Sequence, residues 1–342
     1  MNKRKRVWFI SMIGMLMFSV AASARAETIE NVHSLQGIVV PPGDKGALGQ
    51  SGPTLTDVPD GYYEAAAQQG RLERITYQAQ SAGTDETAIE KDAIVYLPYG
   101  YDESDVETQY NLFYLMHGGG GSETTYLGSE SHPTRLKNMI DHMIEDGVIA
   151  PLIVVAPTLY SGGDTSGDTS LVFYDELEND LMPFIDDQYH TYAEDELSAA
   201  RNHRAFGGFS MGGVTTWSVF INALDHFAYF MPMSGDCWNA GMMGGRNQPG
   251  ETAQILAGAA IDSGYGQDEY FIFSATGSAD MAYENLAPQI AAMQEQSAAF
   301  TFAEGGFSSG NLMFYVVEGN GHDYPYSYEY IYNGLRYFFP VG

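Results

Sequence analysis

A serine set among glycines is the first feature of the sequence that could carry out chemistry. Residues 204–213 read Arg-Ala-Phe-Gly-Gly-Phe-Ser-Met-Gly-Gly and contain the pattern Gly-x-Ser-x-Gly, centred on Ser210. In a nucleophile elbow, a strand turns so sharply into a helix that the serine takes a strained backbone conformation, which only small neighbours allow. The pattern predicts that Ser210 is a nucleophile, although a glycine-rich turn with a chance serine would look the same.

A serine hydroxyl is a weak nucleophile until a base within hydrogen-bonding distance removes its proton. Only two of the eight histidines follow Ser210 in the chain. His226 lies at the end of the helix expected after the serine, which is a poor position from which to reach it. His322 follows the last apolar strand, in the sequence Gly-Asn-Gly-His-Asp. We therefore expect His322 to be the base; the alternative is an ordinary surface histidine.

The histidine needs a carboxylate that fixes its tautomer and stabilises its charged form. Asp280 follows the penultimate expected strand, in Ala-Thr-Gly-Ser-Ala-Asp, and Asp236 follows the strand before it, in Ser-Gly-Asp-Cys-Trp. When the order in the chain is nucleophile, acid, base, both positions are available. We expect Asp280 to be the acid and Asp236 to be a pocket or supporting residue.

Acyl transfer also needs two N–H groups that hold the developing oxyanion. The residue after the nucleophile, Met211, would supply one, and the loop His117–Gly121 would supply the other, because glycines let the backbone approach a bound carbonyl closely. Gly119 is the expected second donor, and Gly118 is the next choice. The glycine run does not have the pattern of a phosphate-binding loop, since no Gly-Lys-Ser/Thr follows it.

Apolar runs with the length of buried strands alternate with helix-like segments from residue 110 onward. Such alternation predicts an α/β fold, with a mostly parallel sheet covered by helices on both faces and ligands bound beyond the carboxyl ends of its strands. The expected strands are 74–78, 93–97, 112–116, 152–156, 205–209, 229–233, 270–275 and 311–317. The expected helices are 134–149, 176–189, 213–223, 251–262 and 281–297.

Residues 1–26 have the composition of a secretory signal peptide. Basic residues at 3–6 precede an apolar run at 7–20, and Ala-x-Ala cleavage patterns follow. An uncleaved membrane anchor is the alternative, but the run is short for a membrane span. We expect a secreted, extracellular protein in which 27–59, rich in Gly, Pro, Ser and Thr, is a flexible lead-in or linker and 60–342 is the catalytic domain.

The chain is strongly acidic, with a net charge of −29 at pH 7 over 342 residues. Residues 1–26 hold five of the 15 Lys and Arg and none of the 44 Asp and Glu, so cleavage would leave a still more negative protein. Such a surface repels phosphate backbones and anionic membranes, which excludes nucleic acid and, after signal cleavage, the membrane as partners. It fits an ordinary secreted enzyme or, alternatively, one adapted to high salt.

Together these motifs resemble the feruloyl esterase domains attached to bacterial xylanases, in the esterase D group of the α/β-hydrolase superfamily. The resemblance covers about residues 60–340, and its motifs are 116–123, 207–213, 230–236, 275–278 with Asp280, and 321–322. By matching positions it implies that Ser210 is the nucleophile, Asp280 the acid and His322 the base. It implies release of ferulic or related hydroxycinnamic acids from plant cell-wall arabinoxylan or from small hydroxycinnamate esters, with no cofactor or metal.

The sequence departs from the family pattern directly after the base. A tryptophan is usual there, whereas this chain has Asp323 and Tyr324, so Tyr324 or Tyr326 is expected to form the aromatic wall beside the leaving group. Trp238 matches an aromatic position of the family and is expected to contact the substrate or to lie in the core. No carbohydrate-binding, dockerin or xylanase segment is visible, so a free-standing esterase is expected.

Two other functions remain compatible with these residues. An acetyl-xylan esterase or a general carboxylesterase would use the same serine, acid and base, because pocket shape selects the acyl group. A non-catalytic carbohydrate-binding relative would not need all three residues, and their joint presence argues against it.

Overall fold

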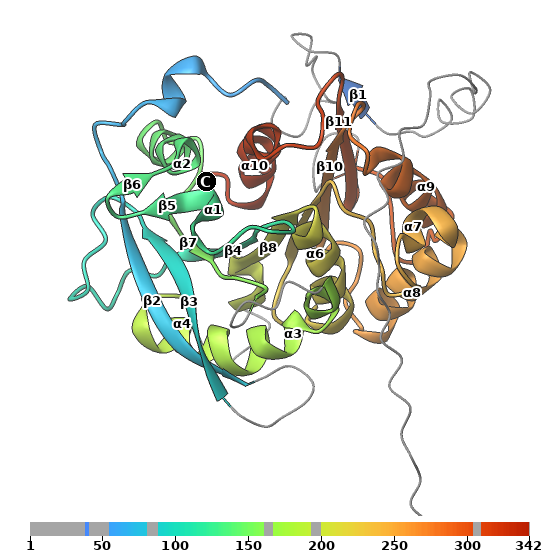
Figure 1. Ribbon diagram of the computed structural model, residues 1–342, viewed down its shortest axis with the longest axis horizontal. Helices are drawn as coiled ribbons and strands as arrows, with labels where there is room; N and C mark the ends of the chain where they lie inside the picture. Colours follow the sequence, from blue (N-terminus) through green and yellow to red (C-terminus); the bar gives the residue numbers. More distant parts are fainter. Residues whose placement is uncertain are drawn as a thin grey trace, which may run out of the picture. The chain divides into compact units, whose positions relative to one another are not determined.

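The computed structural model describes residues 38–40, 55–80, 88–160, 167–192, 200–303 and 309–341, which lie in one compact unit, Leu35–Gly342. The expected signal peptide lies outside these residues. A nine-stranded sheet has the order β1-β11-β10-β9-β8-β4-β7-β3-β2 (Figure 1). Its strands are β1 (Ile38–Val40), β2 (Arg71–Gln80), β3 (Ala88–Leu97), β4 (Asn111–Met116), β7 (Leu152–Ala156), β8 (Arg204–Phe209), β9 (Tyr229–Met233), β10 (Phe271–Gly277) and β11 (Leu312–Val317).

The sheet is mostly parallel, as the sequence predicts. Every pairing from β1 to β7 along the sheet is parallel, whereas β3 pairs antiparallel with both β7 and β2. The carboxyl ends of β4, β8, β9, β10 and β11 therefore lie along one edge. Because each of these strands leads into a loop that carries a predicted site residue, the sheet brings those loops together.

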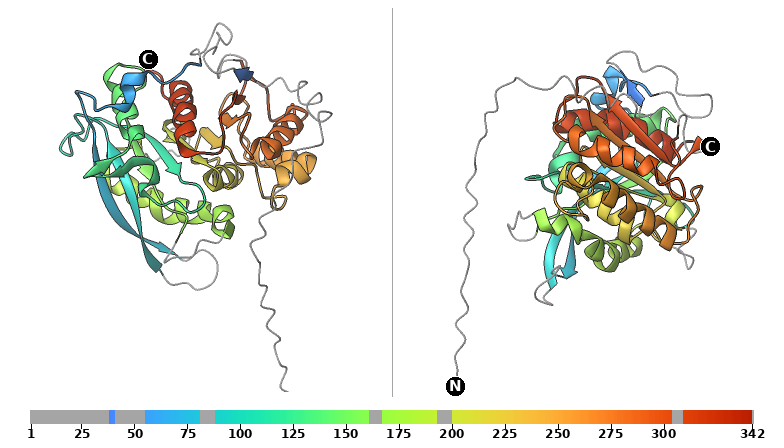
Figure 2. Two further views of the ribbon diagram at one scale, coloured as in Figure 1. Left: turned by 45° about the horizontal axis from the view of Figure 1, so that its top comes forward. Right: turned by 90° about the vertical axis from the view of Figure 1, so that its right-hand side faces the viewer.

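Helices cover both faces of the sheet, and two apolar cores result (Figures 1 and 2). Alternate residues of a strand point to opposite faces, and in β4 Tyr114 belongs to one core and Phe113 to the other. The first core includes α3 (Phe173–Glu176), α4 (Met182–Gln188), α6 (Met211–Asn222), α8 (Pro249–Asp262) and α9 (Tyr283–Gln294). The second includes α1 (Thr124–Leu127), α2 (Arg135–Glu145) and α10 (Tyr324–Phe338).

Most expected elements are present, with two differences in the helices. The single helix expected at 176–189 consists of α3, a π-helical turn (Leu177–Leu181) and α4. Helix α10 was not expected, because its apolar face consists largely of tyrosines, which favour strands as a residue type. Its start follows a common rule, since a proline occupies the first turn.

The packed domain begins before the boundary expected at residue 60. Leu55 is 0% exposed and belongs to the second core, and Val58 is also buried. The Asn333 side chain of α10 accepts a hydrogen bond from Thr56 N–H and donates one to the Thr56 carbonyl oxygen, at 3.1 and 3.0 Å. β1 also pairs with β11. Residues 38–40 and 55–59 are thus part of the packed unit, and the rest of the expected 27–59 linker lies outside the described residues.

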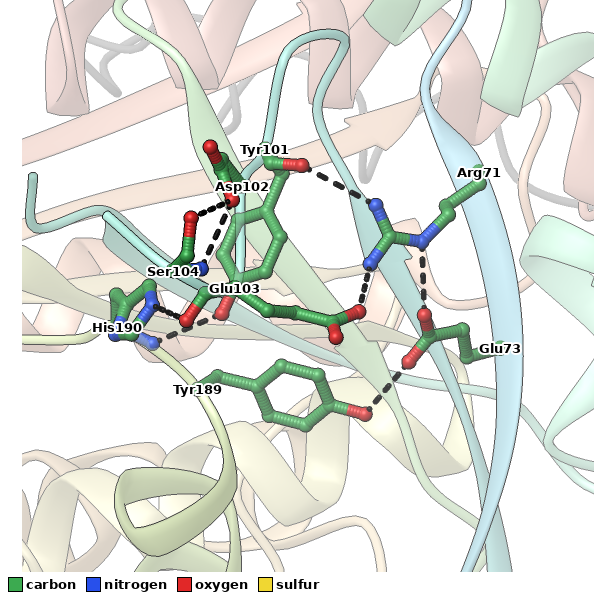
Figure 3. A network of polar contacts seen from close by, with 8 residues as sticks. All are labelled: Arg71, Glu73, Tyr101, Asp102, Glu103, Ser104, Tyr189 and His190. Atoms are coloured by element: carbon green, nitrogen blue, oxygen red, sulfur yellow. Dashed lines mark hydrogen bonds and ion pairs between the residues drawn. The ribbon is translucent and has the colours of Figure 1, made fainter. Parts of the chain in front are cut away.

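The edge strand β2 is linked to neighbouring loops by polar side chains (Figure 3). Arg71 forms ion pairs with Glu73 and Glu103, each at 2.8 Å. Tyr189 donates a hydrogen bond to Glu73, and a ring nitrogen of His190 lies 3.0 Å from the Glu103 carbonyl oxygen. Charged side chains on an edge strand disfavour its pairing with another chain, and exposed ion pairs of this kind contribute little to stability.

Candidate active site

Ser210 stands at the sharp turn between β8 and α6. Its backbone has φ 58° and ψ −115°, a conformation that is strained for any residue other than glycine. Close packing around the turn explains the glycines: a Cβ atom on Gly208 would lie 2.6 Å from the Gly212 backbone, and one on Gly212 would lie 2.4 Å from the Met116 carbonyl oxygen. The elbow predicted from the sequence is therefore present in the structure.

Three loops bring Ser210, His322 and Asp280 into one chain of hydrogen bonds. His322 Nε2 lies 2.9 Å from Ser210 Oγ, and His322 Nδ1 lies 2.7 Å from Asp280 Oδ1. Asp280 Oδ1 also accepts a hydrogen bond from Ala282 N–H at 2.7 Å, and the residue is 4% exposed. With a proton on Nδ1, Nε2 is free to accept the serine proton, which is the arrangement that a general base requires.

Contacts between the loops after β10 and β11 set the separation of Asp280 and His322. Ser278 N–H donates to the Val317 carbonyl oxygen at 2.9 Å, and Ala279 N–H donates to the Asn320 carbonyl oxygen at 3.1 Å. The His322 ring also packs on the Phe209 ring, with a centroid distance of 4.6 Å. His322 is thus held by the loop that carries Asp280 and by the strand that leads into Ser210.

The structure distinguishes the two glycines that were expected to bind the oxyanion. Gly118 N–H donates to the Tyr324 hydroxyl at 2.7 Å, and Gly120 N–H donates to the Tyr160 hydroxyl at 2.9 Å. Among the described residues, no acceptor is recorded for the N–H group of Gly119 or for that of Met211. A Cβ atom on Gly119 would lie 3.4 Å from Met211 Cγ, so these two residues are neighbours.

Asp236 is buried in the neighbouring loop and does not bond to His322. Its two carboxylate oxygens accept hydrogen bonds from Trp238 Nε1–H at 3.0 Å and from Gly245 N–H at 2.9 Å. Burial raises the pKa of the Asp236 carboxyl, and these hydrogen bonds oppose the shift. The half-buried Trp238 is thereby fixed at the end of β9. The geometry makes Asp236 a support for Trp238 and leaves Asp280 as the partner of His322.

The two tyrosines that follow the base differ in position. Tyr324 is half-buried, and its ring packs on Phe209 and Tyr126 at centroid distances of 5.2 and 5.4 Å. Tyr326 is 39% exposed. Tyr324 therefore lies beside the serine, where its hydroxyl contacts the glycine loop.

Three residues that no sequence motif singled out lie against the glycine run 118–121. His117 contacts Gly118, Thr158 contacts His117, and Tyr160 contacts Gly120. His117 is 1% exposed, and its ring nitrogens lie 2.7 Å from the Gly118 carbonyl oxygen and 2.9 Å from Thr158 Oγ1. For His117, the only local sign of a role at the site was its position directly before the glycine run. Thr158 and Tyr160 follow β7, and nothing in their own sequence pointed to the site.

The described residues form neither a metal-binding cluster nor a membrane-spanning helix. No group of three or more His, Cys, Asp or Glu side chains is placed there so that it could hold a metal ion. None of the helices that these residues form has the length and apolarity that a membrane span requires.

Comparison with known sequences relates the chain to xylan-degrading enzymes. Endo-1,4-beta-xylanase Y of Acetivibrio thermocellus is 44% identical over 285 residues, which cover 82% of this chain and 24% of that protein. The endo-1,4-beta-xylanase/feruloyl esterase of Xylanibacter ruminicola is 30% identical over 181 residues, which cover 51% of this chain and 23% of that protein. The chain thus spans about a quarter of the length of these curated relatives.

Solved structures extend this relationship. A mutant of the feruloyl esterase module from Clostridium thermocellum, in complex with sinapinate, is 41% identical, with a TM-score of 0.73 over 86% of this chain and 97% of the module. A ferulic acid esterase from the anaerobic fungus Anaeromyces mucronatus is 20% identical, with a TM-score of 0.57 over 82% of this chain and 96% of that one, and shows likeness of fold alone.

The family model agrees with these relatives. Residues 85–331, most of the chain, match the model of the family described as "Putative esterase". The nucleophile elbow at the carboxyl end of a central parallel strand is the hallmark of the α/β-hydrolase fold. The chain therefore belongs to this esterase family, and with it to the carboxylic ester hydrolases of the α/β-hydrolase fold.

Proposed function

We propose that this protein is a feruloyl esterase that hydrolyses esters of ferulic and related hydroxycinnamic acids. The observation that carries the proposal is the chain of hydrogen bonds from Asp280 through His322 to Ser210, at 2.7 and 2.9 Å. Similarity to a feruloyl esterase module bound to sinapinate supports the acyl group. Similarity to xylanases supports feruloylated arabinoxylan as the polymer that carries it.

In this mechanism His322 removes the proton of Ser210 as Oγ attacks the ester carbonyl carbon. Asp280 holds the proton on His322 Nδ1 and stabilises the imidazolium that forms. The N–H groups of Met211 and Gly119 bind the oxyanion of the tetrahedral intermediate. His322 then gives its proton to the leaving alkoxide, and an acyl-enzyme remains. A water molecule, deprotonated by His322, attacks the acyl-enzyme and releases the carboxylic acid and free Ser210.

Two aromatic side chains are the proposed walls of the substrate site. Trp238 is fixed by Asp236 after β9, and Tyr324 lies at the start of α10. A flat hydroxycinnamate ring gains both apolar burial and stacking beside such side chains, whereas an acetyl group gains neither. This difference favours an aryl acid over acetate as the acyl group. The basic and apolar pattern of residues 1–26 supports export to the extracellular space, where plant cell walls are found.

Hydrolysis of methyl ferulate, measured beside hydrolysis of p-nitrophenyl acetate, tests the proposal. We expect a higher kcat/KM for methyl ferulate and loss of both activities in Ser210→Ala. Ser131→Ala, at an exposed serine, is the matched control and keeps wild-type rates. Activity on the acetate alone would replace the feruloyl assignment with an acetyl or general esterase. Unchanged rates in Ser210→Ala would exclude the mechanism.

Release of ferulate from arabinoxylan tests the polymer. Chromatography of the soluble products should show free ferulate with the wild-type protein and none with Ser210→Ala. If methyl ferulate is cleaved but arabinoxylan is not, small hydroxycinnamate esters are the substrates.

A further inference from the structure

Side chains hold three polar groups of the loop Gly118–Gly121: the N–H and the carbonyl oxygen of Gly118, and the N–H of Gly120. Its first residue, Gly118, uses its N–H group for the Tyr324 hydroxyl at 2.7 Å. The Gly118 carbonyl oxygen lies 2.7 Å from His117 Nδ1 and accepts from Gly121 N–H at 3.1 Å. The carbonyl of Gly118 and the N–H of Gly119 belong to the same planar peptide unit. Whatever fixes that carbonyl also fixes the direction of the Gly119 N–H.

The contacts of His117 identify its tautomer. Leu159 N–H lies 3.3 Å from His117 Nε2, and a backbone N–H can only donate, so Nε2 carries the lone pair. The Thr158 hydroxyl, 2.9 Å from the same nitrogen, can donate to it as well. The proton of the neutral ring is therefore on Nδ1, from which it is donated to the Gly118 carbonyl oxygen.

Glycine at position 121 makes room for this arrangement. A Cβ atom on Gly121 would lie 2.9 Å from both Cβ and Nδ1 of His117. The histidine ring is 1% exposed, and the Tyr160 ring lies beside it at a centroid distance of 5.3 Å. The position of the His117 ring is thus fixed by contacts on several sides, as expected of a side chain that orients a neighbouring peptide.

We propose that His117 and Tyr324 are positioning residues of the oxyanion hole. His117 holds the Gly118 carbonyl and Tyr324 holds the Gly118 N–H, so that Gly119 is the residue of the loop whose N–H is left to bind the acyl oxygen. Met211 N–H is its counterpart on the elbow. Neither positioning side chain bonds to the oxyanion; each acts through the peptide that it fixes. Oxyanion donors act only when they are fixed before the charge develops, so loosening the loop lowers kcat more than it weakens substrate binding.

The two ring nitrogens of His117 can be tested separately. Asparagine places a donor near the position of Nδ1, whereas glutamine places its amide near Nε2 and leaves the Gly118 carbonyl with only the Gly121 N–H as a donor. We expect His117→Asn to keep most of the wild-type kcat for methyl ferulate and His117→Gln to lose about 10- to 100-fold, with KM changed by less than about threefold. Tyr324→Phe, which leaves Gly118 N–H unpaired, should lower kcat by about 10-fold.

Inhibition by phenylboronic acid gives a second readout. Boronic acids form a tetrahedral adduct with an active-site serine and place an oxygen where the oxyanion would be. The inhibition constant should therefore rise in His117→Gln by about the factor by which kcat falls. Equal losses in His117→Asn and His117→Gln, or an unchanged inhibition constant beside a reduced kcat, would mean that His117 only fills space and would overturn the proposal.

Controls separate this inference from general damage and from the proposed function on which it rests. His132→Ala and Tyr99→Phe, at exposed positions, should leave kcat unchanged, and far-ultraviolet circular dichroism should show that every variant is folded. If His117→Gln does not fold, the inhibition constant of phenylboronic acid for Tyr324→Phe is the test: a rise that matches the fall in kcat supports the proposal, and an unchanged value overturns it. If p-nitrophenyl acetate is cleaved and methyl ferulate is not, the same variants are measured on the acetate, and only the feruloyl assignment is lost. Activity retained in Ser210→Ala would instead exclude the proposed function itself.

Discussion

The backbone of Gly235 lies directly against the carbonyl oxygen of Ser210, from which a Cβ atom on Gly235 would be only 2.3 Å away. The loop after β9 therefore supports the nucleophile elbow from the side opposite the glycine loop. Trp217 Nε1–H donates to the Gly235 carbonyl oxygen at 2.9 Å and keeps this loop in place.

Gly235→Ala should displace the elbow. Because the atom that a methyl group would meet is backbone and cannot rotate away, we expect a loss of about 1–3 kcal/mol in the free energy of unfolding and a fall of about 100-fold in kcat. Urea denaturation and methyl ferulate kinetics measure the two effects. Gly258→Ala, on α8 with no atom within 4 Å of the new methyl group, is the matched control and should be neutral or slightly stabilising.

Asparagine substitutions at Asp280 and Asp236 should give different defects. Asp280→Asn removes the negative charge that keeps the proton on His322 Nδ1 and stabilises the imidazolium, and we expect kcat to fall by roughly 10⁴-fold. Asp236→Asn keeps one acceptor for Trp238 Nε1–H or Gly245 N–H but not both, so it should mainly raise KM and reduce stability by about 1–3 kcal/mol. The larger loss of kcat in Asp236→Asn would transfer the role of acid to that residue.

The ion pair between Lys91 and Glu176 should stabilise the fold only as a pair. Their charged atoms lie 2.7 Å apart, with side chains 2% and 7% exposed, and Tyr77 donates a further hydrogen bond to Glu176. Burial lowers the pKa of Lys91 and raises that of Glu176, and the attraction between the charges opposes both shifts. Lys91→Met should therefore cost about 3–5 kcal/mol in the free energy of unfolding.

The double variant Lys91→Met with Glu176→Gln supplies the control for this pair. The second substitution removes the Glu176 charge that Lys91→Met leaves unpaired. The double variant should therefore recover a large part of the lost free energy of unfolding, and kcat should be unchanged in both variants. Additive losses in urea denaturation would show that the two side chains are not coupled.

Stability should fall on mild acidification, in part because of His117. Burial lowers the pKa of His117 below its ordinary value of 6.5, so the unfolded chain binds a proton at a pH where the folded protein does not. The free energy of unfolding then decreases as the pH falls through the ordinary pKa towards the lowered one. Burial lowers the pKa of His226 as well, with the same sign.

Comparison of the wild-type protein with His117→Asn measures how much His117 contributes to this loss of stability. Between about pH 7.5 and about pH 5.5, the decrease measured by urea denaturation should be smaller in His117→Asn than in the wild-type protein. An identical decrease in both would show that His117 is not held neutral.

The residues proposed as nucleophile, acid and base could be singled out in the sequence because each follows a recognisable apolar strand, and the structure places them within hydrogen-bonding distance of one another. The roles of Gly118 and Gly119 could not be separated in this way, because the difference comes from the Tyr324 hydroxyl, 206 residues further along the chain. The proposed role of His117 likewise rests on its contact with Leu159 N–H, 42 residues away. Long-range contacts of this kind leave no periodic pattern in the sequence.

The limits of the domain were harder to predict for a similar reason. Leu55 and Val58 are too few to form a period, and they are buried in the core that also contains the unexpected helix α10. The contacts between Asn333 and Thr56 join this early segment to α10 across 277 residues of sequence, a distance that no local pattern reveals.

The distance along the chain between the nucleophile and its base has a consequence for synthesis. Ser210 and His322 are 112 residues apart, and at about 5–20 residues per second the ribosome needs roughly 6–22 s to add that stretch. During this interval the growing polypeptide carries Ser210 without its proposed base. The proposed catalytic centre is complete only when β11 has been added beside β10 and His322 reaches the elbow.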